Sequence, residues 1–300
     1  MGTSASGGGA SNSNPLIPSW ILPEGGIPTT DNDAAGDGKE GDNDHQGDGG
    51  PIGVSDGQPQ APSDQMPNAP IVPSNRYTAP RRQFNKFVGS GGSDRGAFDK
   101  AIGGYSRSAS GSTSGLARRM MPSTIRVAGF SQAINSIRSE GLEVALTNLN
   151  LSEYIGRSVV DILSALTDFI FRDGEGEFQD TQDDGLTRQA YANAITRICE
   201  HGDIDLNALS NENIEVMTAI FIEETIVQRI FTDIGNDMTK KESDVSKLVE
   251  IEETTYQIVS GLVRNKIKPQ IQAMQLGDQT SMRRDIENIY RIAFDVLSQL

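Results

Sequence analysis

The residues of this chain that could carry catalysis or bind a metal are few and widely spaced. The sequence has two histidines, His45 and His201, and one cysteine, Cys199. Cys199 and His201 are two positions apart near a predicted helix end, so their side chains point in different directions. We therefore expect no catalytic Cys–His pair. The expected roles are a buried, unreactive cysteine and a histidine that complements a helix C-terminus.

The acidic residues do not match a known catalytic or calcium-binding pattern either. Segment Asp173–Glu177 begins like an EF-hand loop, but the sixth and twelfth positions hold Phe178 and Asp184 instead of Gly and Glu. The pairs Glu223–Glu224 and Glu252–Glu253 diverge on a helix, which predicts a solvated face.

P-loop, GxSxG, HExxH and CxxC motifs are absent from the sequence. We expect a non-enzymatic protein with no catalytic residue, no metal and no cofactor.

Charge divides the chain into three parts. Residues 1–75 hold ten acidic residues and one basic residue, and they are rich in Gly, Ser, Asn, Asp and Pro. Residues 76–126 hold ten basic and two acidic residues, whereas residues 127–300 hold 29 acidic and 15 basic residues. The formal net charge of -15 argues against direct nucleic-acid binding by the surface as a whole. The middle segment is the only basic island.

These contrasts predict an all-α protein with three regions. Residues 1–75 cannot bury enough apolar surface to offset the entropy of ordering, so we expect a long disordered acidic tail. Residues 76–121 predict a basic, glycine-interrupted junction whose short amphipathic helices need the C-terminal domain or a partner to pack on. Apolar residues at helical spacing over residues 122–300 predict a helical bundle.

Capping and breaking residues give the expected helix boundaries in that bundle. Ser158, Ser210 and Asp244 are expected to begin helices as N-caps. Another helix is expected from about Leu186. Pro269 is expected to kink or end the helix that Asp244 begins.

Partner-docking residues are expected in two clusters: Leu16, Ile17 and Trp20 in the tail, and Arg81, Arg82, Phe84 and Phe87 in the junction. The tail cluster is an apolar island in a polar segment, and it either docks a partner or packs back on the helical domain. The basic junction is expected to contact nucleic acid, a partner protein or the chain's own acidic domain. The self-contact is favoured because that domain is covalently close.

Cysteine content and hydropathy indicate a cytoplasmic protein that does not cross a membrane. A single cysteine fits a reducing compartment. The N-terminus lacks a secretory signal, and no apolar run approaches the roughly 20 residues of a membrane span.

The start of the chain, Met1–Ser6 followed by Asn14–Trp20, resembles the QatB family of bacterial Qat anti-phage systems. Segments Ala79–Phe87, Ser90–Arg95 and Ala101–Tyr105 extend this resemblance into the junction. The remainder matches that family only in helical character. The resemblance implies a defence role without catalytic residues. It also implies three partners: a P-loop ATPase, a QueC-like nucleobase-handling enzyme and a TatD-like nuclease.

The resemblance also gives Gly2 a candidate role as a modification site. Removal of Met1 would expose the Gly2 α-amine, whose pKa of about 8 in peptides leaves a nucleophilic fraction near pH 7. QueC-like proteins activate a deazaguanine carboxylate, and its transfer to this amine would give an amide-linked nucleobase. A plain flexible terminus is the alternative.

Two other functions are compatible with the sequence. One is a structural or chaperone-like helical protein with a disordered head. The other is a lipid-anchored protein, because Met1, Gly2 and Ser6 fit the myristoylation pattern. This last function ranks below the others because bacteria generally lack the transferase.

Overall fold

A computed structural model of the 300-residue chain describes residues 76–108, 113–171, 182–202 and 204–300. Within these ranges every regular element is a helix, which confirms the all-α prediction. The elements are α1 (Thr78–Gly89), α2 (Arg95–Ser108), α3 (Thr113–Arg119), α4 (Met121–Glu140), α5 (Leu142–Asn148), the 3-10 helix η2 (Ser152–Tyr154), α6 (Val159–Ile170), α7 (Gln182–Glu200), α8 (Asn211–Ile234), α9 (Met238–Lys241), α10 (Val245–Ala273) and α11 (Gln279–Ser298). None of these helices is both long and apolar enough to span a bilayer.

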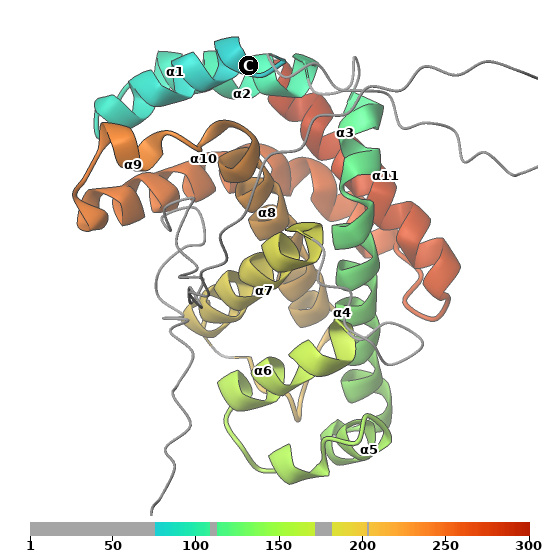
Figure 1. The fold of residues 1–300 in the computed structure, drawn as a ribbon. Coiled ribbons are helices and arrows are strands. Elements are labelled where there is room, and N and C mark those ends of the chain that lie inside the picture. The colour runs from blue at the N-terminus through green and yellow to red at the C-terminus, as the bar shows by residue number, and fades with distance from the viewer. Residues whose placement is uncertain (1–75, 109–112, 172–181, 203) are drawn as a thin grey trace, which may run out of the picture. The chain divides into compact units, whose positions relative to one another are not determined.

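Helix α8 is the centre of the bundle. Every residue from Met217 to Phe231 is buried, although a surface helix would bury only one stripe. Helices α4, α7 and α10 pack on it, and Figure 1 shows α8 between α7 and α10. Because α8 is covered on all sides, its polar residues must find partners inside the protein.

An aromatic cluster joins α8 to its neighbours on one side. The rings of Phe130 on α4 and Tyr191 on α7 lie 5.5 and 5.1 Å, between centroids, from the ring of Phe221 on α8. The Tyr191 hydroxyl donates to the Leu163 carbonyl of α6 at 2.6 Å. These edge-on and tilted contacts fix four helices around one apolar centre.

The junction helices pack on this bundle. Phe84 of α1 contacts Phe231 of α8 with ring centroids 5.8 Å apart, and Phe87 of α1 contacts Phe98 of α2 at 5.0 Å. Helices α2 and α3 both pack on α11, as Figure 1 also shows. The junction helices were expected to pack on either the C-terminal domain or a partner. In the structure they pack on the chain's own C-terminal helices.

The predicted caps are confirmed. The hydroxyl of Ser158 accepts from the Asp161 N–H, that of Ser210 accepts from the Asn213 N–H, and the Asp244 carboxylate accepts from the Ser246 N–H. Each bond satisfies an N–H group that the first turn of a helix leaves without a helical partner.

Two helix boundaries differ from those expected. Helix α7 begins at Gln182, four residues before Leu186. Of the two effects expected of Pro269, a kink or a helix end, the structure excludes the end, because helix α10 continues to Ala273. Proline removes the donor for the carbonyl four residues earlier, that of Asn265. Both residues lie on the exposed side of α10, where water can hydrate that carbonyl.

Candidate functional site

The predicted docking residues of the junction differ in burial. Phe84 and Phe87 have no exposed surface and belong to the core. A partner could reach them only if α1 left the bundle, so their docking role stays a prediction. Arg82 is exposed on α1. The tail residues predicted to dock or to be modified lie outside the described residues: Gly2, Leu16, Ile17 and Trp20.

A buried carboxylate on α8 binds the junction to the bundle. Asp233 accepts a hydrogen bond from the Tyr105 hydroxyl of α2 at 2.7 Å and one from Arg119 Nη2 of α3 at 3.2 Å. The Asp233 carbonyl accepts from Arg81 Nε of α1 at 2.9 Å. One residue therefore contacts all three junction helices. Burial raises the pKa of Tyr105 well above its usual value, and the Asp233 charge raises it further, so the hydroxyl remains a donor.

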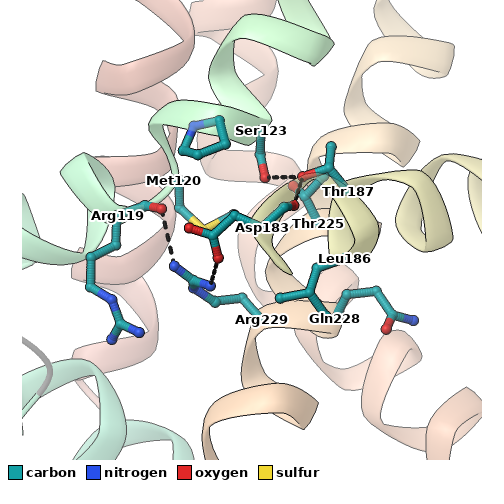
Figure 2. Close-up of a pocket in the computed structure, with 10 residues that line it drawn as sticks. Arg119, Met120, Ser123, Asp183, Leu186, Thr187, Thr225, Gln228 and Arg229 are labelled. Carbon is teal, nitrogen blue, oxygen red and sulfur yellow. Dashed lines mark hydrogen bonds and ion pairs between the residues drawn. The ribbon is translucent and has the colours of Figure 1, made fainter. Parts of the chain in front are cut away.

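A cleft lies beside Asp233, where α3 ends and α4 begins. Pro122 lies in the first turn of α4, where a missing N–H costs no bond of that helix, but it cannot donate to the Arg118 carbonyl and so continue the hydrogen bonds of α3. Arg229 of α8 links the end of α3 to α7. Its Nη2 donates to the Arg119 carbonyl at 3.1 Å, and its Nη1 pairs with Asp183 of α7 at 2.6 Å. Figure 2 shows Arg229 between these two partners.

A small chamber, lined by both polar and apolar side chains, adjoins this cleft. The hydroxyls of Ser123 and Thr187 lie 2.9 Å apart, as Figure 2 shows, and Thr225 also lines the wall. The chamber has a volume of about 10 Å³, roughly the space that one water molecule needs. Two buried polar atoms of lining residues, Arg229 Nε and Gln228 Oε1, have no hydrogen-bond partner among the described residues.

Three glutamates that were expected on a solvated face are buried instead. Glu223 and Glu224 on α8 and Glu252 on α10 are 0, 1 and 8% exposed, and only Glu253 of the two predicted pairs is exposed. The prediction was wrong because other helices cover α8 on every side. The sequence holds a signal for this, since the Glu223–Glu224 pair interrupts an otherwise apolar run.

The buried carboxylate charge of Glu223 is balanced by an ion pair and hydrogen bonds. Arg264 of α10 pairs with both carboxylate oxygens, at 2.8 and 2.5 Å, and the Tyr256 hydroxyl donates to one of them at 3.0 Å. A two-pronged guanidinium contact of this kind holds a carboxylate in a fixed orientation.

Glu224 and Glu252 form a close pair that shares donors. Asn193 Nδ2 of α7 lies 3.4 Å from an oxygen of each carboxylate. Burial raises the pKa of each carboxyl group from 4.5 to about 7. The Arg197 ion pair lowers the pKa of Glu224 but does not offset its burial, and the Glu224 charge raises the pKa of Glu252 further. The pair therefore binds protons near neutral pH.

Nucleophile and metal chemistry find little support in the described residues. Cys199 is a free, half-buried thiol, and burial raises its pKa, which disfavours the reactive thiolate. His201 is exposed. No group of three His, Cys, Asp or Glu side chains within the described ranges is placed to hold a metal.

The chain matches a protein-family model. The model for QatB, described as Qat anti-phage system associated protein QatB, matches residues 111–297, which is more than half of the chain. The matched region runs from α3 through nearly all of α11, so it contains Asp233, Arg229 and the buried glutamates. Neither the curated proteins nor the solved structures include a significant match.

The buried pair makes stability depend on pH. Folding raises the pKa of Glu224 and Glu252 from 4.5 to about 7, so the folded chain binds more protons than the unfolded chain between these values. The free energy of unfolding should therefore fall as pH rises from 4.5 to 7, by up to about 3 kcal/mol for one fully shifted carboxyl group. Glu252→Gln should reduce this slope and stabilise the protein at pH 8.

Urea unfolding of the full chain at several pH values measures this effect. Glu250→Gln, at an exposed position of the same helix, is the matched control and should keep the wild-type slope. A Glu252→Gln slope equal to the wild-type slope would contradict the assignment.

Proposed function

The chain belongs to the QatB family of Qat anti-phage system associated proteins, and we propose that within anti-phage defence it is a non-catalytic adaptor for the other proteins of its system. The observation that carries this proposal is the way the buried charged residues are used. Most of them pair with an oppositely charged residue of another helix, as Glu223 does with Arg264 and Asp233 with Arg119. Such pairs fix the arrangement of helices and leave few charged groups for a substrate.

The proposed partners are a P-loop ATPase, a QueC-like enzyme and a TatD-like nuclease, and catalysis would reside in them. The resemblance of the sequence to the QatB family supports this set. The proposed compartment is the cytoplasm, where a free thiol such as that of Cys199 stays reduced.

An exposed face of α1 is the proposed contact for an acidic partner surface. Arg82 and Lys86 are both exposed and are four residues apart, so they lie on the same side of the helix. Arg81, in contrast, is used inside the chain through its bond to Asp233. The residues proposed to contact a partner, Arg82 and Lys86, are therefore not the residues that hold α1 in place.

The N-terminal part of the proposal concerns Gly2. Its α-amine, once Met1 is removed, has no side chain to crowd it, and the following residues are small. We propose that the QueC-like partner joins a deazaguanine carboxylate to this amine, with loss of the group that activates the carboxylate.

Charge reversal on α1 tests the adaptor role. Arg82→Glu with Lys86→Glu should reduce co-purification of at least one partner about tenfold or more, because like charges would then face the acidic surface. The stability of the variant should change little, since both side chains are exposed. Arg157→Glu with Arg284→Glu, also at exposed positions, is the control. Equal partner recovery from both double variants would contradict the proposed surface.

Intact-mass analysis tests the modification. The chain, co-expressed with the three proposed partner proteins, should carry an added deazaguanine mass on the peptide that begins at Gly2. Cells with an inactivated QueC-like partner should yield the unmodified peptide. An unmodified peptide from cells that resist phage would contradict the proposal for Gly2 and leave the adaptor role intact.

A further inference from the structure

A solvent-open cleft of about 340 Å³ lies next to the chamber drawn in Figure 2. The chamber adjoins the cleft, because five residues line both spaces: Arg119, Pro122, Asp183, Leu186 and Arg229. The volume falls at the small end of the range for ligand sites, roughly 300–1,000 Å³. A compact small molecule would fill it.

The charges of the cleft do not cancel. Arg229 pairs with Asp183 at 2.6 Å, and Arg119 pairs with Asp233 at 3.2 Å. The third arginine of the lining, Arg118, is exposed and makes no hydrogen bond or ion pair with the described residues. The cleft thus has one guanidinium in excess, although residues 127–300 are strongly acidic. This excess favours an anionic ligand.

A second guanidinium, that of Arg229, lines the same cleft and is largely buried. Arg229 is 8% exposed, and its Nε has no hydrogen-bond partner among the described residues. The Asp233 carboxylate is its nearest ion-pair partner, at 3.9 Å, which is too long for a hydrogen bond. The other two nitrogens of this guanidinium are held by Asp183 and the Arg119 carbonyl. The guanidinium of Arg229 is therefore fixed in place before any ligand arrives, and its positive charge lies at the wall of the cleft.

The remaining walls are partly apolar. Pro122 and Leu186 line the cleft on the α4 and α7 sides and can contact a ring or a short hydrocarbon group. Recognition would then combine apolar contact with a few fixed polar groups, as is usual in small-molecule sites.

We propose that this cleft binds a small organic oxyanion, a phosphate or carboxylate on a compact apolar group, whose oxygens contact Arg118 and Arg229. This proposal does not depend on the adaptor role or on Gly2. The cleft is built from α3, α7 and α8 and the start of α4, so a bound ligand would add contacts between the junction and the bundle. Binding should therefore raise the unfolding temperature of the chain.

Titration calorimetry and thermal unfolding of the full chain test the proposal with three probes: phenyl phosphate, benzoate and inorganic phosphate. At least one of the first two should bind and raise the unfolding temperature, and the better probe identifies the oxyanion. Inorganic phosphate should bind more weakly than phenyl phosphate because it lacks the apolar group. Arg118→Ala should weaken binding of the better probe about tenfold, through loss of a charged hydrogen bond.

Arg157→Ala is the matched control, because it removes an exposed arginine elsewhere, and its affinity should equal that of the wild type. Arg118→Lys should retain part of the affinity. Absence of binding of both phenyl phosphate and benzoate would overturn the proposal. Equal weakening by Arg118→Ala and Arg157→Ala would also overturn it, because it would indicate general charge attraction without a site.

Discussion

The buried carboxylate of Asp233 is the interaction on which the placement of the junction depends. Its side chain accepts from α2 and α3, and its backbone carbonyl accepts from α1, so a single turn of α8 holds the first three described helices. A buried charge is tolerated only when paired, and removal of one partner is far more costly than removal of an exposed ion pair. Two basic residues of the junction, Arg81 and Arg119, are therefore used inside the chain. Exposed residues of α1 such as Arg82 remain for other contacts.

The same logic extends along α8 and its neighbours. Glu223 pairs with Arg264 of α10, and Glu224 pairs with Arg197 of α7. Arg126 of α4 donates both to Asp184 at the start of α7 and to a carbonyl at the end of α6. An apolar core stabilises many helix arrangements almost equally, whereas each buried ion pair favours one neighbour in one register. The charged residues of the bundle thus specify its arrangement, and the apolar residues supply most of the driving force.

The sequence predicted the local features and missed those set by packing. Ser158, Ser210 and Asp244 act within one helical turn, so their capping roles could be read directly. The burial of Glu223 had only one signal, the apolar run around it, and the helices that cover α8 could not be read because they are set by packing. That α10 continues past Pro269 could not be read, because the cost of a proline depends on whether the freed carbonyl faces water. The cleft at Arg229 was missed because its walls are distant in sequence. The family match covers the helical region, where the sequence alone offered only helical periodicity.

Hydrogen exchange tests most directly whether Asp233 anchors the junction. Asp233→Asn keeps the shape of the side chain and removes its charge, so the bonds to Tyr105 and Arg119 weaken. We predict faster amide exchange in α2 and α3, and also in α1 because it packs on α2, while the middle of α8 stays protected. Asp168→Asn, at an exposed position of α6, is the control and should leave the exchange pattern unchanged. Unchanged exchange in α1–α3 of the Asp233→Asn protein would contradict the account.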